Sequence, residues 1–244
     1  MSREADYLAG YDPSRFPALL TTVDMAIFCI RDGKLHVLLV QRASFPARGE
    51  WTLPGGFVDP TGDINLEATA GRKLTEKTGV MTPYLEQVCS VGNSTRDPRG
   101  WSITVLYFAL IDQAAVAPGN ADVEAVQWVP LEEALDQTLA FDHCELLRRA
   151  TRRLRAKARY SALPLKLLPS QFTLAELQQV FEVLLGAKLE RKSFRRRILS
   201  ANLLEETGRL QPTSRRPAMV YRLIREVDED FAFPGLIHSK PSEL

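Results

Sequence analysis

Cysteine is scarce in this sequence, and its three cysteines lie far apart. Cys29, Cys89 and Cys144 form no C-x-x-C pair and are odd in number. This excludes a disulfide-stapled fold and a zinc site built from four cysteine ligands. We expect the three residues to be reduced thiols in the core of a cytosolic protein.

Long apolar runs are missing too. The longest, Ile103 to Ile111, is far shorter than the ~20 residues that a transmembrane helix needs. The N-terminal residues Met1 to Asp6 lack the features of a secretory signal peptide. The sequence therefore predicts a cytoplasmic protein that has no membrane partner.

The formal net charge of +1 hides an asymmetry along the 244 residues. Residues 1–147 hold 11 Lys and Arg against 20 Asp and Glu, whereas residues 148–225 hold 19 against 5. Residues 226–244 are acidic again, with one Lys against five Asp and Glu. A basic segment of this kind indicates a polyanionic partner for the second half of the chain.

The first half has the pattern of an α/β sandwich. Two apolar runs, Thr22–Ile30 and Leu35–Gln41, flank Asp32-Gly33, which is a strong hairpin signal. We expect a helix over Leu66–Lys77, the segment that carries the motif described below. The remaining predicted elements are strands at Leu85–Gly92, Ser102–Asp112 and Glu124–Val129 and a short helix, opened by Pro130, at Leu131–Gln137.

The segment from Arg72 to Val80, Arg-Lys-Leu-Thr-Glu-Lys-Thr-Gly-Val, follows Gly56 by sixteen residues. It resembles the box of the Nudix hydrolase family, G-x5-E-x7-R-E-U-x-E-E-x-G-U, where U is aliphatic. Gly56, Arg72, Leu74, Glu76, Gly79 and Val80 keep the pattern. The loop is two residues longer than in the box, and Asp59 and Asp63 are the nearest candidates for its glutamate.

Two of the three box-helix carboxylates are replaced by Lys73 and Lys77. Positions 73, 76 and 77 share one helix face, where three glutamates make an oxygen site for Mg²⁺. Lys, Glu and Lys change the formal charge of that face from −3 to +1, and protonated amines repel a divalent cation. We therefore expect no metal site, no tight Mg²⁺ binding and no catalytic residue. A solvated helix of mixed charge is the alternative, disfavoured by the Leu-Pro-Gly-Gly-Phe-Val stretch upstream.

Three further segments narrow the resemblance: Leu53–Asp59, Thr95–Trp101 and Ala140–His143. They are similar to the ADP-ribose-type branch of the family, and more similar still to the Nudix-related transcriptional regulators of NAD metabolism. That resemblance implies a degenerate hydrolase domain that senses ADP-ribose or a related nucleotide, fused to a winged helix that binds DNA.

Side-chain chemistry gives candidates for the nucleotide site. Phe45 or Trp51 can stack on adenine, and cationic side chains can neutralise a diphosphate that has lost its metal. His143 is as well suited to cap a helix as to touch ligand, while Trp101 and Phe141 are expected in the core. The predicted ligand-binding residues are Phe45, Trp51, Arg72, Lys73, Glu76, Lys77, Asp97, Arg99 and His143.

The second half predicts a helix-turn-helix with a wing. Thr173 and Glu176 form a capping box for a helix that Gly186 closes. A basic helix, Arg191–Leu199, follows, with Phe194 and Ile198 toward the core. Wing strands are predicted at Leu210–Thr213 and Met219–Leu223, and a long helix at Cys144–Tyr160 links the halves. The predicted DNA-binding residues are Arg191, Lys192, Ser193, Arg195, Arg196, Arg215 and Arg216, with Arg191, Lys192, Arg195 and Arg196 on the outer side of their helix.

The predicted fold is thus a Nudix-type α/β/α sandwich with a C-terminal winged helix-turn-helix domain. Its domains are residues 1–155, 156–226 and an acidic tail, 227–244. The predicted function is a homodimeric repressor that binds a palindromic duplex operator and senses ADP-ribose or a related nucleotide. The alternative is an active Nudix ADP-ribose pyrophosphatase with a nucleic-acid-binding tail, which Lys73 and Lys77 argue against.

Overall fold

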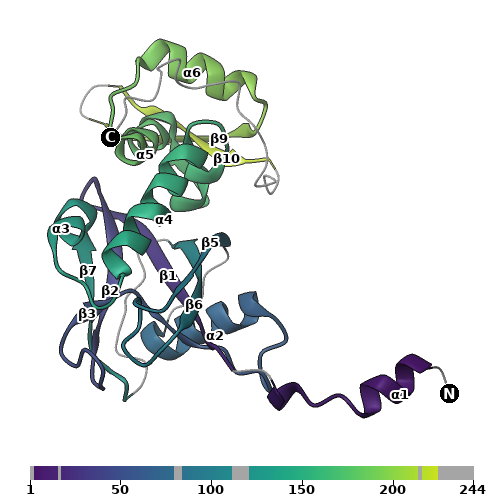
Figure 1. Ribbon diagram of the computed structural model, residues 1–244. Coiled ribbons are helices and arrows are strands. Elements are labelled where there is room, and N and C mark those ends of the chain that lie inside the picture. Colours follow the sequence, from purple (N-terminus) through teal and green to yellow (C-terminus); the bar gives the residue numbers. More distant parts are fainter. Residues whose placement is uncertain (1–2, 16–17, 80–83, 112–120, 214–215, 225–244) are drawn as a thin grey trace.

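The computed structural model describes residues 3–15, 18–79, 84–111, 121–213 and 216–224. Figure 1 shows two bodies, a sheet-based sandwich and a smaller helical body, with a long helix running from one to the other. The predicted tail and the predicted DNA-binding residue Arg215 lie outside the described residues, as do Val80 and Asp112.

The sandwich contains a sheet of seven strands in which β1 is central. β1 pairs with β2 and β4 in antiparallel fashion and with β6 in parallel, and β3, β5 and β7 complete the sheet. Asp32 and Gly33 have positive φ angles of 49° and 71°, which confirms the predicted β1–β2 hairpin. The strands are β1 Leu20–Arg31, β2 Lys34–Arg42, β3 Trp51–Thr52, β4 Gly55–Phe57, β5 Leu85–Asn93, β6 Ser102–Leu110 and β7 Val123–Pro130.

Helices cover both faces of this sheet (Figure 1). α2, Leu66–Thr78, packs on the face that carries Val23, Met25 and Ile27 of β1. α3, Leu131–Asp136, and α4, His143–Ala158, pack on the face that carries Ala26 and Phe28. Because successive strand residues point to opposite faces, the apolar run Met25–Ile30 of β1 serves both layers. The α/β/α sandwich is confirmed.

The box helix α2 has clear signals at both ends. The Asn65 side chain accepts a hydrogen bond from the backbone N–H of Ala68 at 2.7 Å and caps the first turn. Gly79 has a φ of 69° and donates its N–H to the Thr75 carbonyl at 2.9 Å. The motif residues from Arg72 onward thus form the C-terminal part of α2, and the motif glycine ends the helix.

The smaller body is a winged helix. Thr173 and Glu176 form the predicted capping box, and Gly186 ends α5 with a φ of 64°. Phe194 and Ile198 of α6 are buried against α5, as predicted. The elements are 3-10 helix η2 Leu163–Leu167, β8 Phe172–Thr173, α5 Leu174–Leu185, α6 Arg191–Ser200, β9 Leu204–Gln211 and β10 Ala218–Leu223.

The prediction of the first wing strand was wrong. β9 begins at Leu204, six residues before the predicted start at Leu210, and pairs with β10 in a three-stranded sheet with β8. Its sequence, Leu-Glu-Glu-Thr-Gly-Arg-Leu-Gln, is mostly exposed and lacks an apolar alternation. A strand held by its backbone partner rather than by a buried face gives little signal in the sequence.

One hydrophobic cluster crosses from the sandwich into the winged helix. It joins strand residues such as Phe28 to Leu146 and Leu154 of α4, and these to Val180 and Leu184 of α5. The predicted boundary at residue 155 lies inside α4 and stays a prediction. The two bodies share part of their core.

The N-terminal residues stand apart from this core. α1, Arg3–Ala9, has no buried residue, and both figures show it projecting from the sandwich with the 3-10 helix η1, Pro13–Arg15.

Among the described residues, no helix has the length and apolarity to cross a membrane. Cys29 is buried as expected, whereas Cys89 and Cys144 are only half-buried.

Because the two bodies share a core, a substitution in α5 that leaves a cavity should also destabilise α4. Leu184→Ala is expected to lower the free energy of unfolding by ~2–5 kcal/mol and to speed amide hydrogen exchange in both α5 and α4. Leu177→Ala is the matched control, because Leu177 is equally buried but packs within the winged helix. It should leave α4 exchange unchanged. Equal exchange rates in α4 of the wild type and Leu184→Ala would contradict a shared core.

Candidate ligand cavity and DNA-binding face

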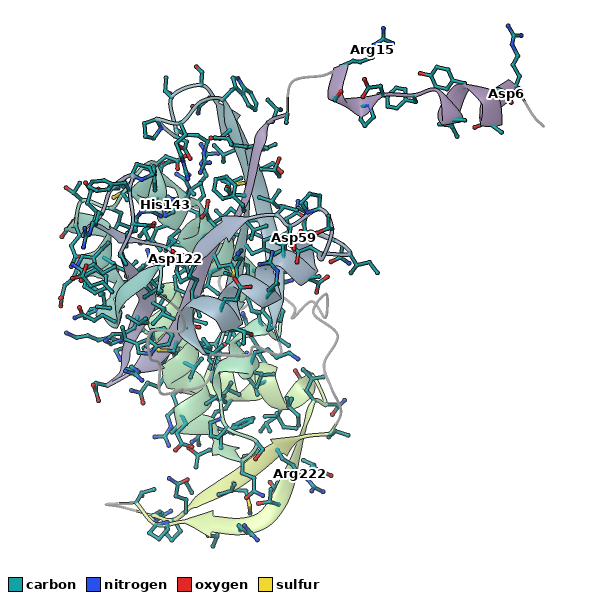
Figure 2. All side chains as sticks on the ribbon, turned by 90° about the horizontal axis from the view of Figure 1, so that it is seen from below. Asp6, Arg15, Asp59, Asp122, His143 and Arg222 are labelled. Carbon is teal, nitrogen blue, oxygen red and sulfur yellow. The ribbon has the colours of Figure 1, made fainter. Side chains whose placement is uncertain are left out.

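A cavity of about 220 Å³ opens beside the box helix, between β1, β2, α2 and the loops that follow β5 and precede α4. Figure 2 shows two of its lining residues, Asp122 and His143, within the sandwich and far from α1. Six of the nine predicted ligand residues line the cavity: Phe45, Lys73, Lys77, Asp97, Arg99 and His143.

Buried charged groups form the floor of this cavity. Arg96 donates two hydrogen bonds of 3.0 Å to the Asp142 carboxylate and lies 3.5 Å from Asp24. Arg96 and Asp24 are less than 10% exposed. Asp142 is the residue before α4, so this pair ties the start of α4 to the floor of the cavity.

His143 is held in one tautomer by its neighbours. Its Nδ1 accepts the backbone N–H of Leu53 at 3.1 Å and lies 2.6 Å from the Thr52 hydroxyl. The ring proton therefore sits on Nε2, which faces an Asp24 oxygen at 3.7 Å. Burial lowers the pKa of His143, so the ring is neutral at pH 7. His143 both begins α4 and lines the cavity.

Two arginines stand at the sides of the cavity. Arg99 pairs with Asp97 at 2.7 Å and lies 4.8 Å from the centre of the Phe57 ring. Arg42 lies 5.1 Å from the centre of the Phe141 ring. Burial, together with the positive charge of Arg99, lowers the pKa of Arg42. An anion bound between the two guanidiniums would relieve their repulsion.

Both box lysines line the cavity and are paired. Lys73 lies 2.9 Å from Glu76, and its stem lies against Gly56, where a β-carbon would approach the Lys73 Cε to 3.0 Å. Lys77 lies 3.2 Å from Asp122. The lining as a whole has five cationic side chains, Arg42, Lys73, Lys77, Arg96 and Arg99, against three carboxylates, Asp24, Asp97 and Asp122. The excess of positive charge suits a diphosphate.

Three predicted ligand residues, Trp51, Arg72 and Glu76, lie outside the cavity lining. Trp51 packs against the core beneath β3. Arg72 donates to Asp63 at 2.7 and 2.5 Å and to Glu76 at 3.0 Å, and its hydrogen bonds to Asp63 hold the pKa of that carboxyl well below its usual range. Asp63 thus fastens the long loop to α2, whereas Asp59 accepts hydrogen bonds from Thr61 within its own turn.

Sequence reasoning missed several cavity residues. Asp24 could have been found from the sequence, because it is a lone acid within an apolar strand. Arg96 lies inside Thr95–Trp101, one of the three segments that carry the family resemblance. Arg42 gave no signal. Phe141 was expected in the core but lines the cavity with a φ of 58°, and Trp101 is 46% exposed. Both expectations were wrong because a loop can hold a large aromatic side chain at the surface.

Positions 73, 76 and 77 of α2 carry the metal-binding carboxylates of the family box. In this chain only Glu76 keeps a carboxylate there. Burial alone would raise its pKa, but the hydrogen bonds that it accepts from Lys73 and Arg72 outweigh burial and lower the pKa. Within the part of the chain that the structure describes, no group of three or more His, Cys, Asp or Glu side chains could hold a metal ion.

The predicted DNA-binding face lies on α6 and the wing. Arg191, Lys192, Arg196 and Arg216 are exposed. Ser193 and Arg195 are half-buried, so Arg195 was wrongly predicted to lie on the outer side. Its Nε is buried and has no hydrogen-bond partner among the described residues.

Comparisons with known proteins agree with this geometry. The NUDIX domain family matches residues 20–150, and the NrtR DNA-binding winged helix domain matches residues 164–223. The ADPR responsive transcriptional repressor NtrR of Acinetobacter baylyi is 51% identical, over 97% of this chain and 94% of that protein.

Two solved structures of a Shewanella oneidensis protein are similar as well. NrtR complexed with a 27mer DNA has a TM-score of 0.78 at 48% identity, over 88% of this chain and 98% of that one. The NUDIX domain of NrtR complexed with ADP ribose has a TM-score of 0.60 at 52% identity, over 63% of this chain and 99% of that one. The chain belongs to the NrtR family, in which a Nudix domain is followed by an NrtR-type DNA-binding winged helix.

Proposed function

We propose that this protein is a DNA-binding transcriptional repressor of NAD metabolism genes that senses ADP-ribose in its Nudix domain and does not hydrolyse it. The observation that carries the proposal is the cavity with five cationic and three anionic side chains beside a helix that has lysines where the Nudix box has metal-binding glutamates. The named functions of the Acinetobacter and Shewanella relatives support it.

The cavity can recognise a diphosphate through its own side chains. Arg42 and Arg99 offer guanidinium donors, and Lys73 and Lys77 supply charge from α2. Phe45 is 80% exposed at the edge of the cavity, where its ring is available to stack on adenine. Because the His143 ring is neutral and its Nε2 faces Asp24 at 3.7 Å, we do not assign it the role of an acid at the diphosphate.

An active ADP-ribose pyrophosphatase remains the second candidate, on the strength of the Nudix fold itself. It would need Mg²⁺ held by the box helix, where Glu76 is already bonded to Arg72 and Lys73. Incubation of the protein with ADP-ribose and Mg²⁺ should release no AMP or ribose phosphate at a sustained rate. Steady Mg²⁺-dependent turnover would establish the pyrophosphatase instead.

The route from ligand to DNA is proposed to pass through α4. Its first residues, with Asp142 just before them, contact the floor of the cavity, and its later residues pack against α5. The β1–β2 hairpin gives a second contact, because a β-carbon on Gly33 would lie 3.1 Å from Gln179 of α5. A coupling free energy of ~1–3 kcal/mol would weaken DNA binding by ~5–150-fold.

A homodimer on a palindromic operator follows from the same proposal, because two recognition helices reach successive major grooves about one helical turn apart. Such a regulator acts where bacterial DNA lies, in the cytoplasm. The predicted sites Phe45, Trp51, Arg72 and Glu76 remain proposals for contacts with the nucleotide or for support of its cavity.

Removal of either cavity arginine should weaken nucleotide binding. Arg99→Ala and Arg42→Ala are each expected to reduce ADP-ribose affinity by ~1.5–3 kcal/mol, the range for a hydrogen bond to a charged group, as measured by calorimetry. Arg31→Ala is the control, because Arg31 stacks on Trp128 away from the cavity. An unchanged affinity in both cavity variants would place the diphosphate elsewhere.

Loss of the charge at the start of α4 should uncouple ligand from DNA. Asp142→Asn removes the partner of Arg96 and is expected to reduce the effect of saturating ADP-ribose on DNA affinity toward one-fold, as followed by fluorescence anisotropy. Glu145→Gln on the same helix, where Glu145 pairs with Arg149 at the surface, is the control. If Asp142→Asn responds to ADP-ribose as the wild type does, α4 is not the route.

A further inference from the structure

A basic cleft of about 290 Å³ lies between the start of α5, α6 and the base of the wing. Its lining includes Arg191 and Arg195 of α6 and, from the wing, Arg216 and Tyr221. The described residues that line the cleft include no carboxylate. Three guanidiniums therefore share a small space that has no acidic side chain in its lining.

The nearby carboxylates are engaged by other groups. Glu176 accepts from the backbone N–H and hydroxyl of Thr173 at 2.7 and 3.0 Å, and Glu206 accepts from the Tyr221 hydroxyl at 3.3 Å. Among the described residues, Arg191, Arg195 and Arg216 take part in no ion pair. The buried Nε of Arg195 has no hydrogen-bond partner there either. A buried donor without a partner costs free energy until something binds it.

The backbone adds further donors. Leu174 and Ala175 line the cleft and occupy the first turn of α5, where helix geometry leaves N–H groups without intrahelical partners. Thr173 caps the N–H of Glu176, one residue further on, at 3.2 Å. A small anion in the cleft would meet arginine donors on two sides and a positive helix end on the third.

We propose that this cleft binds one backbone phosphate of duplex DNA, and that Arg191, Arg195 and Arg216 position the protein on the duplex without reading its sequence. The assignment rests on the proposed DNA-binding function and divides the residues of α6 by role. Arg191 and Arg195 lie four positions apart on the face toward the wing, and Lys192 and Arg196 form the neighbouring exposed face. Sequence readout belongs to that exposed face.

Salt dependence separates the two roles. Each phosphate contact contributes ~0.9 to the slope of log affinity against log salt concentration. Binding is measured by fluorescence anisotropy with two probes, a duplex that the wild-type full chain selects from a random library and a shuffled duplex of the same composition. Arg195→Ala and Arg216→Ala should each weaken both probes by the same factor and reduce the slope measurably, by at most ~0.9 because the arginines share one phosphate.

Two further variants are controls. Arg196→Ala should weaken the selected duplex by ~5–150-fold, or ~1–3 kcal/mol, and leave the shuffled duplex within about two-fold of wild type. Arg222→Ala removes an exposed wing cation that pairs with Glu205 outside the cleft, so it tests for a general effect of charge. It should leave the slope unchanged. Thermal melting shows whether the Arg195→Ala variant folds. If it does not, the Arg216→Ala variant, whose substitution lies in the exposed wing, tests the cleft by itself.

Selective loss of the chosen duplex in Arg195→Ala and Arg216→Ala would overturn the proposal, because it would show base readout from the cleft. An unchanged slope in both variants would overturn it too, and so would an equal reduction in Arg222→Ala. If the wild type selects no sequence, the operator-binding function fails. The slopes on the shuffled duplex still test whether the cleft binds a phosphate.

Discussion

The burial of α4 between two bodies is the constraint on which the rest of the structure depends. One side of the helix packs on the sheet of the Nudix domain, and its later residues meet α5 of the winged helix in the same hydrophobic cluster. Buried ion pairs hold both ends, Arg96 with Asp142 at the start and Lys157 with Glu86 at 2.5 Å near the end. We expect a helix fixed in this way to move as a unit, so that in the proposed coupling a change at the cavity floor would displace α5 or strain its packing.

The box helix retains the caps and the loop contact of a hydrolase motif but carries lysines at two of its three carboxylate positions. Asn65 and Gly79 still cap it, and Arg72 still fastens the loop through Asp63. Lys73 and Lys77 line the cavity at positions where the family box has carboxylates for a metal. Under the proposed function, leaving the nucleotide intact would let the protein report its concentration, and the cationic lining would compensate the charge of the diphosphate.

Most of the fold was predictable because its elements have strong local signals. The Asp32-Gly33 turn, the Thr173 capping box and the helical spacing of α5 agree with the structure to within a few residues. The polar strand β9 was misplaced because its register depends on its partner β10 and not on a buried face. Burial of Arg195 could not be read from α6 alone, since the wing that covers it comes from later in the chain.

The site was harder to predict than the fold for a related reason. Residues near the motif, such as Lys73 and Lys77, were found. Asp24 and Arg42 reach the cavity through pairing with distant strands, Asp24 with β4 and Arg42 with β7. Arg96 and Asp142 meet across 46 residues of sequence, which no local pattern encodes. Long-range charge pairs of this kind carry the proposed coupling.

Reciprocal linkage tests the central claim most directly, because a coupling through α4 must act in both directions. The affinity for ADP-ribose would be measured by calorimetry on the free protein and on the protein saturated with its selected duplex. The account predicts that DNA weakens ADP-ribose binding by the same factor, within ~5–150-fold, by which ADP-ribose weakens DNA binding. Identical ADP-ribose affinities with and without DNA would contradict it.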